Sequence, residues 1–314
     1  PIIEDKLFFF VGYEESERMS PNNSRPIDAA DEAELLQIKD FLMQRYNYDA
    51  GWPIFNTPPE TQEQTLVKLD YTINENHRVE YIYQDTQDIN YREYDRPASN
   101  YVFSAHYYVY PIDRQKNTFA YVGDISDDLS VEMKYTDIVY KNDQDPLGGE
   151  NFGHHRIRCA YAYPTGDQYR SANETNIDEQ ILNLKATLLR GNHTISVGYD
   201  MHEKFVSNLF IAYENGRWRF NSVDDFLNGN VTYMRFNKPV DGNLMTGAAV
   251  VDSEMSTFYI EDVVDVSDIL TLNFGVRVDT IEQPENTAGY NPAFEALAGS
   301  VSYTHLRAHE TRPY

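Results

Sequence analysis

The sequence predicts an all-β fold, an antiparallel transmembrane β-barrel of which this chain supplies only a part. Two observations predict it. Apolar and polar residues alternate along several pairs of segments, and a period of two places the two kinds on opposite faces of a strand. A tight turn joins the two segments of each pair, whereas long polar segments separate one pair from the next. Short turns at one end of the strands and long loops at the other are typical of transmembrane β-barrels.

The clearest hairpin lies at residues 65–88, with the sequence TLVKLDYTINENHRVEYIYQDTQD. On both arms an apolar or aromatic residue alternates with a polar or charged one. Asn74-Glu75-Asn76 separates the arms, and asparagine tolerates the backbone angles of a tight turn. The segment therefore predicts an antiparallel hairpin with one apolar face and one charged face.

Three further hairpins follow the same pattern, with turns near residues 124–129, 190–192 and 266–268. An aromatic-rich strand at residues 6–15 precedes the first hairpin. The sequence thus predicts nine membrane passes, at residues 6–15, 65–73, 77–87, 115–125, 130–140, 180–190, 193–203, 252–266 and 269–280.

Each pass is expected to turn its apolar residues to lipid and its polar residues to the barrel interior. In the last pass the residues expected to face lipid are Leu270, Leu272, Phe274, Val276 and Val278. The charged residues expected to face the interior are Lys68, Asp70, Glu80, Lys134, Lys185, Arg277 and Asp279.

The polar segments between the hairpins are expected to form long external loops. Residues 31–46 carry apolar residues at helical spacing and predict one short loop helix, with Asp31 and Glu34 placed as a capping box. Residues 101–110 and 118–123 predict two parts of one long strand, bent at Pro111. Residues 157–163 predict a strand above the membrane, and residues 205–250 an external excursion with small strands at 218–220 and 231–236.

The composition limits the classes of protein. The chain of 314 residues contains no run of 18 apolar residues, which excludes a membrane-spanning helix. Its net charge of −24 makes nucleic acid an unsuitable partner. Cys159 is the single cysteine, so no disulfide framework is expected. The 25 tyrosines against 2 tryptophans would suit aromatic girdles at the two membrane interfaces.

Four groups of residues could be read as catalytic or metal-binding, but a structural role explains each of them more simply. Asp127-Asp128 and Asp224-Asp225 resemble acid–base or metal-binding pairs, but both lie beside turns, where solvated aspartate is common. His154-His155 lacks the further ligands that a zinc site needs. The polar segment 142–150 lacks the spacing of a calcium-binding loop. We therefore predict no catalytic residue, no metal site, no cofactor and no enzyme, and we assign no ligand-binding residues.

Several landmarks resemble, in the right order, the barrel of TonB-dependent outer-membrane receptors, with the best agreement in the Oar-like subgroup. The opening segment PIIEDKLFFFVGYE resembles the first barrel strand of these receptors, and KLDYTINENHR at residues 68–78 resembles a following hairpin. Later landmarks are residues 191–195, 208–210, 220–226 and 290–294. The resemblance extends over nearly all of residues 1–300.

The resemblance implies a function in uptake across the outer membrane of a Gram-negative bacterium. In this family a barrel of about 22 strands is filled by an N-terminal plug domain. An external ligand binds, and the TonB energy-coupling complex acts on the plug to open a path. The implied partners are outer-membrane lipid, the chain's own plug domain, the TonB complex, reached through a region N-terminal to Pro1, and a small-molecule, glycan or peptide ligand.

The sequence also gives expectations for the two ends of the chain, and it leaves three other classes of protein as alternatives. Residues 301–311, VSYTHLRAHET, resemble a translated sequencing-library adapter, so we expect a partial barrel at residues 1–300 and a non-native tail at 301–314. The chain opens without an initiator methionine, as expected of a piece of a longer protein.

The alternatives to a TonB-dependent receptor are a soluble β-sandwich that binds carbohydrate, a glycoside hydrolase with paired carboxylates, and a passive porin.

Overall fold

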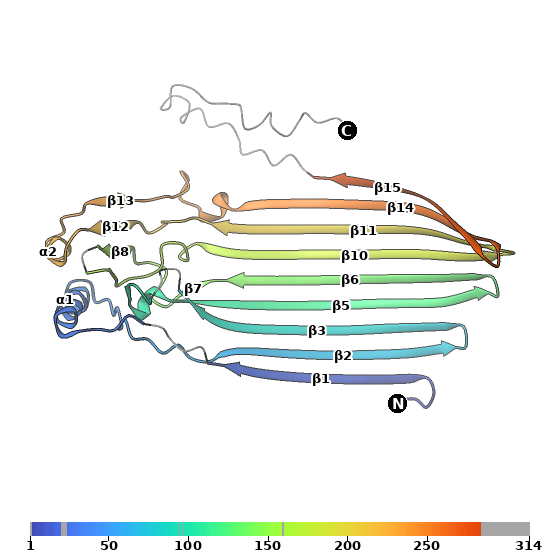
Figure 1. Ribbon diagram of the computed structural model, residues 1–314, viewed down its shortest axis with the longest axis horizontal. Helices are drawn as coiled ribbons and strands as arrows, with labels where there is room; N and C mark the ends of the chain where they lie inside the picture. Colours follow the sequence, from blue (N-terminus) through green and yellow to red (C-terminus); the bar gives the residue numbers. More distant parts are fainter. Residues whose placement is uncertain (1, 20–23, 94, 96, 159, 284–314) are drawn as a thin grey trace, which may run out of the picture. The chain divides into compact units, whose positions relative to one another are not determined.

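Nine long strands form one antiparallel sheet, which we call the wall (Figure 1). The computed structural model describes residues 2–19, 24–93, 95, 97–158 and 160–283. Neighbours in the wall are also neighbours in the chain, and a short strand β7 (Asp145–Pro146) pairs with β5. The wall strands, in order, are β1 (Leu7–Arg18), β2 (Glu60–Asn74), β3 (His77–Arg92), β5 (Tyr108–Ser126), β6 (Leu129–Asp143), β10 (Asn173–Arg190), β11 (His193–Phe210), β14 (Ala249–Ser267) and β15 (Leu270–Glu282).

The nine strands confirm the nine predicted passes. Each pass overlaps one wall strand, in the same order, and every strand runs at least two residues further at the end where the long loops emerge. The turns at the other end are tight. Between β10 and β11 only Gly191 and Asn192 intervene, and Gly191 has φ +65, a left-handed conformation that favours glycine.

The register of the wall separates polar from apolar side chains. Residues directly opposite each other in antiparallel strands share a face. Asp70 pairs with Glu80, Glu80 with Ala120, and Ala120 with Lys134. The same sequence of pairs continues through Asn183, Asp200 and Thr257 to Asp279. All seven charged residues predicted for the interior therefore lie on one face, which we call the polar face.

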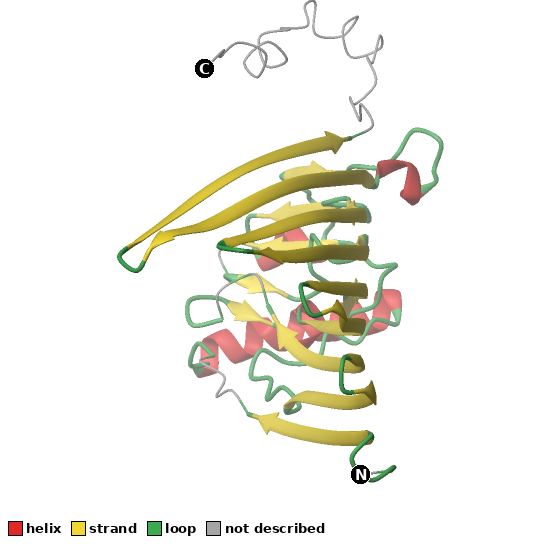
Figure 2. Cartoon of the chain, turned by 90° about the vertical axis from the view of Figure 1, so that its right-hand side faces the viewer, coloured by secondary structure: helices red, strands yellow, loops and turns green. Residues whose placement is uncertain are grey.

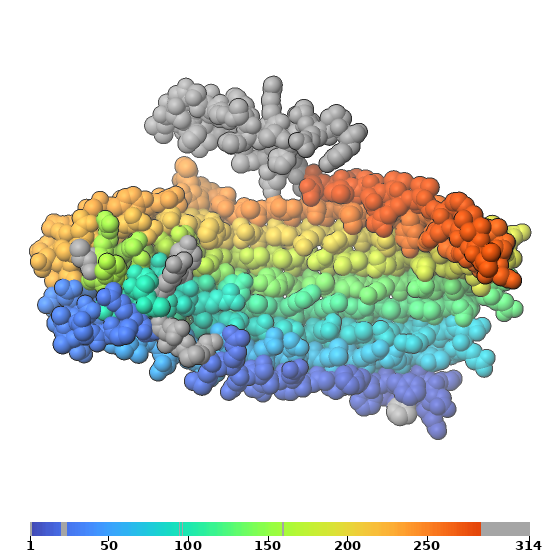
Figure 3. All heavy atoms as spheres, in the orientation of Figure 1, coloured from blue at the N-terminus to red at the C-terminus, as the bar shows by residue number. Residues whose placement is uncertain are grey.

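The opposite, apolar face is bare. The five residues of β15 predicted to face lipid are exposed by 39–64%. Two residues opposite them on β14, Phe258 and Ile260, are exposed by 52% and 44%. These exposed fractions show that no described element covers these residues. In the space-filling view the strands of the wall form successive bands in chain order (Figure 3).

A second assembly, which we call the loop layer, is built from the long loops at one end of the wall (Figures 1 and 2). It comprises the described residues of 19–59, 93–107, 144–172 and 211–248. Helix α1 (Ala29–Tyr46) and helix α2 (Val223–Leu227) belong to it, with 3₁₀ turns η1 (Ser104–His106) and η2 (Leu244–Gly247). A five-stranded sheet has the order β13 (Tyr233–Arg235), β12 (Arg217–Phe220), β8 (His154–Ile157), β9 (Ala162–Tyr163) and β4 (Tyr101–Val102).

The loop layer has its own apolar core. Leu35, Ile38 and Leu42, on one side of α1, are at most 1% exposed. They share a cluster with Phe103, Ile157, Phe220 and Phe226, residues of the five-stranded sheet, α2 and a connecting segment. Fully burying a side chain of this size contributes about 1.5–3 kcal/mol. None of the helices described is long and apolar enough to cross a lipid bilayer.

The helix was predicted in the right place with the wrong cap. Asp28, not Asp31, precedes the first turn, and its carboxylate accepts hydrogen bonds from the backbone N–H of Ala30 and Asp31, both at 2.9 Å. Asn47 ends the helix in the left-handed conformation, with φ 53. At 18 residues the helix is also longer than the short helix expected.

The bent strand predicted over residues 101–123 is wrong in its first part. Tyr101 and Val102 belong to β4 in the loop layer, whereas β5 runs unbroken through Pro111. Pro111 lies between the segment of β5 that pairs with β7, up to Val109, and the segment that pairs with β6, from Asp113. At this point β5 pairs with β3, where Pro111 lies opposite Ile89, and on the side of β6 the Pro111 carbonyl oxygen accepts a hydrogen bond from the side-chain amide of Asn142. The proline thus lies where β5 has a strand partner on one side only, which tolerates its missing N–H.

Candidate functional site

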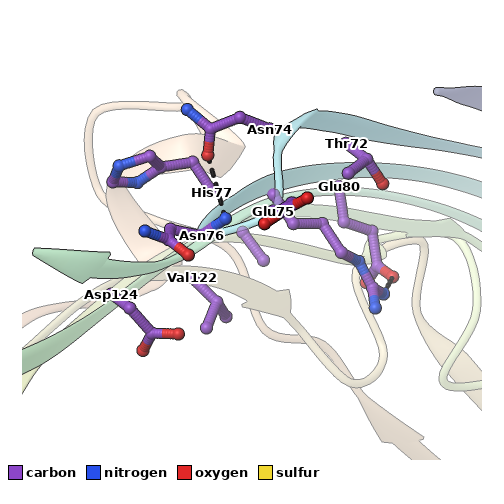
Figure 4. A pocket seen from close by; sticks show the side chains of 10 residues that line it. Thr72, Asn74, Glu75, Asn76, His77, Glu80, Val122 and Asp124 are labelled. Atoms are coloured by element: carbon purple, nitrogen blue, oxygen red, sulfur yellow. Dashed lines mark hydrogen bonds and ion pairs between the residues drawn. The ribbon is translucent and has the colours of Figure 1, made fainter. Parts of the chain in front are cut away.

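The polar face of the wall holds a chain of ion pairs near the tight turns. Lys68 Nζ lies 2.6 Å from Glu80 Oε2, and Arg78 Nη2 lies 3.0 Å from Asp70 Oδ1 and 3.2 Å from Glu80 Oε2. Arg78 and Glu80 of this chain of ion pairs line a hollow of about 380 Å³ beside the β2–β3 turn (Figure 4). The side chains remain partly exposed, so the pairs are solvated and each contributes little to stability.

On the far strands the same face carries a second network. Thr257 donates a hydrogen bond to Asp279 at 2.6 Å, and Arg277 donates to the same carboxylate at 2.9 Å. Neither network combines a nucleophile with a base, and each basic group faces a carboxylate. The polar face therefore provides a hydrated, charged surface rather than a catalytic site.

The loop layer contains a buried polar centre around His106, whose side chain is fully buried. His106 Nδ1 donates to the carbonyl oxygen of Thr165 at 2.8 Å, and its Nε2 lies 3.0 Å from Asp95 and 3.8 Å from Asp167. Both ring nitrogens thus face acceptors. Burial by itself lowers the pKa of His106, but Asp95 and Asp167 outweigh it, and the pKa lies above its usual value. His106 therefore links two loop segments, 93–107 and 144–172, through its two ring nitrogens.

His154 and His155 lie beside this centre without forming a metal site. His154 Nδ1 donates to the Gly166 carbonyl oxygen at 3.2 Å, and burial together with the charge of His106 lowers its pKa well below the usual value. His155 stacks on Trp218, with ring centroids 5.3 Å apart, and burial lowers its pKa to about 4. Successive strand residues point to opposite faces, which separates the two rings. No group of three metal-ligating side chains occurs among the described residues.

The other candidate residues have structural roles. Asp127 and Asp128 form the β5–β6 turn, and Asp224 and Asp225 occupy the first turn of α2, behind the capping residue Ser222. In the segment 142–150, the amide of Gln144 donates to the Asn142 side-chain oxygen at 3.0 Å, so this part of the segment forms an amide network. Cys159 lies outside the described residues.

A group of four arginines lies on one face of the five-stranded sheet. Arg217 and Arg219 of β12 are two residues apart and so share a face; β13 places Arg235 opposite Arg217, and β8 aligns Arg156 with Arg219. We call these four residues the arginine row. Only part of the arginine row could be predicted from the sequence: the alternation of Arg217, Trp218 and Arg219 indicates that the two arginines share one face of a strand. The buried centre around His106 has no such signal, because its residues are far apart in the chain.

The family follows from the whole sequence. Residues 21–308 match the model of the outer membrane beta barrel domain family, which is most of the chain. The chain belongs to this family. It is therefore a protein of the outer membrane of Gram-negative bacteria, with the bare face of the wall turned to lipid and the polar face turned to the interior. In barrels of the outer membrane the short turns lie in the periplasm and the long loops outside the cell.

Solved structures with similar folds are outer-membrane transporters and receptors. The outer membrane transporter YddB from Escherichia coli is 9% identical, with a TM-score of 0.48, over 71% of this chain and 27% of that one. The FrpB iron transporter from Neisseria meningitidis is 12% identical, with a TM-score of 0.47, over 89% and 36%. The ferric-catecholate import receptor Fiu from Escherichia coli is 12% identical, with a TM-score of 0.45, over 90% and 41%.

This chain spans about 27–41% of the length of these three proteins. No curated protein matches its sequence.

Proposed function

We propose that this chain forms part of the barrel of a TonB-dependent outer-membrane receptor, of the Oar-like subgroup, that binds an external ligand and imports it. The observation that carries the proposal is the loop layer. An 18-residue helix and a five-stranded sheet pack on a common apolar core at the external end of the wall. An ordered external layer of this size is suited to hold a ligand before it enters the barrel.

Two features of the wall support uptake through a filled barrel. The polar face carries matched ion pairs, such as Lys68 with Glu80 and Arg277 with Asp279. Such a surface can hold a polar plug domain by exchangeable hydrogen bonds. Most of the landmarks that resemble TonB-dependent receptors lie on these strands or their turns, whereas residues 220–226 lie in the loop layer and residues 290–294 lie outside the described residues. The TonB complex and the plug are therefore the proposed partners, in addition to lipid.

The alternatives fit the arrangement less well. A soluble β-sandwich would bury Leu270, Phe274 and Val278 between two sheets, whereas these residues are exposed by 48%, 57% and 57%. A glycoside hydrolase requires two carboxylates across a substrate cleft. Carboxylates such as Glu80 and Asp279 on the polar face and Asp95 in the His106 centre instead face basic groups.

A passive porin shares the barrel, and experiment separates it from a receptor. The full-length protein, purified from its bacterium, is placed in a planar lipid bilayer, and uptake is followed in cells with and without a functional TonB system. A receptor with a filled barrel gives no steady conductance, and its uptake of nutrient stops when TonB is lost. Steady open channels together with TonB-independent uptake would contradict the proposal and identify a porin.

A further inference from the structure

The arginine row concentrates positive charge in a chain that is otherwise strongly acidic. The chain has 50 acidic and 26 basic residues, so a carboxylate would be the expected neighbour of any arginine. Yet none of Arg156, Arg217, Arg219 and Arg235 has a carboxylate oxygen of a described residue within 4.0 Å. Arg219 is close enough to Arg217 and Arg156 that burial and these two charges lower its pKa. Such crowding of like charge is unfavourable unless an anion relieves it.

Two guanidinium groups of the row have unused donors. Arg217 is 9% exposed, and the Nε atoms of both Arg217 and Arg219 are buried without a hydrogen-bond acceptor among the described residues. A buried donor without a partner costs about 1–3 kcal/mol, and more when it is charged. These N–H groups are inaccessible from outside, so the charge of the row is not balanced from within by the described residues, and an external oxyanion would meet the row at its exposed edge.

Tyrosine rings hold the arginines in place without neutralising them. The guanidinium carbon of Arg235 lies 4.6 Å from the ring centroid of Tyr213, and that of Arg217 lies 5.9 Å from it. In the same way Arg219 lies 5.0 Å from the Tyr233 ring. Arg217 also makes a side-chain hydrogen bond with Tyr213. For Arg219 and Arg235, contact over an aromatic face leaves the edge of the guanidinium plane, which carries the N–H donors, clear of the ring.

The carboxylates nearest the row are already engaged. Asp95 and Asp167 face His106, and Glu214 Oε1 lies 2.9 Å from Lys238 Nζ. The sheet has an apolar opposite face, where Trp218 stacks on His155 and Phe220 packs into the core. The row therefore has a packed apolar layer beneath it and no counter-ion among the described residues.

We propose that the arginine row binds the carboxylate or phosphate groups of the ligand that this receptor takes up. The inference rests on the proposed function, since it names the chemical class of the imported ligand. Planar guanidinium groups bind both kinds of oxyanion through paired hydrogen bonds, which are stronger than hydrogen bonds between neutral groups. A ligand with two or more such groups would engage Arg217 and Arg219 together, while the more exposed Arg235 would meet it first.

The test measures binding to the purified full-length protein by isothermal titration calorimetry, with citrate and inorganic phosphate as separate probes. We expect saturable binding of at least one probe to the wild type, weaker at high salt. Arg217→Gln with Arg219→Gln should weaken it at least about tenfold, since each charge-assisted hydrogen bond lost accounts for about a factor of ten. Arg235→Ala, at an exposed position where folding is unaffected, should weaken it about threefold to tenfold.

Arg45→Ala is the matched control, because it removes one arginine of the loop layer from the exposed side of α1, away from the row. Its affinity should equal that of the wild type. No binding of either probe to the wild type, or wild-type affinity in both Arg235→Ala and the folded double variant, would overturn the inference. If only vesicles that contain lipid A bind the row, the arginines dock on the outer leaflet and the inference is wrong. TonB-dependent uptake, measured separately, can hold in each of these cases, so the two proposals fail independently.

Discussion

The wall leaves its large apolar side chains exposed, whereas the loop layer packs apolar side chains into a core of its own. On the wall, charged residues such as Lys68 and Glu80 are paired but partly exposed, and the large apolar residues of the other face are bare. In the loop layer a cluster of apolar residues, among them Leu35, Ile38 and Leu42, is fully buried, and so is a histidine that faces two aspartates. The wall therefore depends on lipid to cover its apolar face, whereas the loop layer is organised as a small water-soluble domain.

This difference predicts where a single substitution should lower the free energy of unfolding most. On the wall the cost of a charge depends on the face that it enters, because one face meets hydrocarbon and the other water. In the loop layer the cost depends on whether a buried group keeps its partner. Four predictions test the two halves of this comparison, from the largest expected effect to the smallest.

The buried centre of the loop layer should be the most sensitive position. His106→Ala leaves Asp95 and Asp167 without the ring that faces both, and removing one partner of a buried charged pair costs about 3–5 kcal/mol. Hydrogen exchange of the loop layer, followed by mass spectrometry, measures the loss. The matched control is His193→Ala on the wall, where His193 Nδ1 lies 2.8 Å from Asp262 but both side chains are partly exposed. The control should cost under about 1 kcal/mol, and equal effects would contradict the comparison.

On the wall the face should decide the outcome of the same substitution. Leu184 lies on the apolar face of β10, next to Met133 and Tyr199, and Asn183 lies on the polar face, where it donates to Asp200 at 2.8 Å. Leu184→Arg should lower the free energy of unfolding by about 2–4 kcal/mol if the residue lies near the bilayer midplane. Asn183→Arg should cost less than about 1 kcal/mol, because its new charge meets water and Asp200. Denaturant titrations of the full-length protein in lipid compare the two, and similar losses would show that the faces are not distinct.

The loop layer should weaken in acid through His155. Its pKa in the folded protein, about 4, is below the usual 6.5, so the neutral ring stabilises the fold above pH 6.5. This stability is lost as the pH falls from about 6.5 to 4. The full shift corresponds to about 3 kcal/mol, and the partial exposure of the ring reduces the expected loss to about 2 kcal/mol.

His155→Phe keeps the ring that stacks on Trp218 and removes the titration. The pH dependence of hydrogen exchange in the loop layer should therefore be less steep in this variant. Comparing slopes removes the constant cost of the lost hydrogen bond to Gly153. An identical slope in variant and wild type would assign the acid sensitivity to other groups.

The smallest effect concerns the start of helix α1. Asp28→Ala removes the carboxylate that accepts from Ala30 and Asp31 and should cost about 1 kcal/mol of loop-layer stability. Glu34→Ala, at the position expected for a capping box that begins at Asp31, is the control and should change stability by a few tenths. A larger loss of stability in Glu34→Ala than in Asp28→Ala would support the capping box predicted from the sequence and contradict the cap at Asp28.

Prediction from sequence was reliable where alternation was long and failed where contacts were non-local. The arms around Leu69 and Phe274 repeat polar and apolar residues often enough to fix both strand and face. Short strands such as Tyr101–Val102 carry no such repeat, and their sheet is decided by partners far along the chain. His106, Asp95 and Asp167 are likewise brought together only by the folded loops, so no local pattern announces them. Residues 301–314, expected to be a non-native tail, lie outside the described residues.

The central claim is that the bare face of the wall contacts lipid and the charged face contacts water. Spin labels placed one at a time at positions 182–186 of β10, in the full-length protein in bilayers, test it most directly. Collision with oxygen, which concentrates in hydrocarbon, should be frequent at Leu182, Leu184 and Ala186. Collision with a water-soluble nickel complex should be frequent at Asn183 and Lys185. A reversed alternation, or low collision rates at all five positions, would contradict the claim.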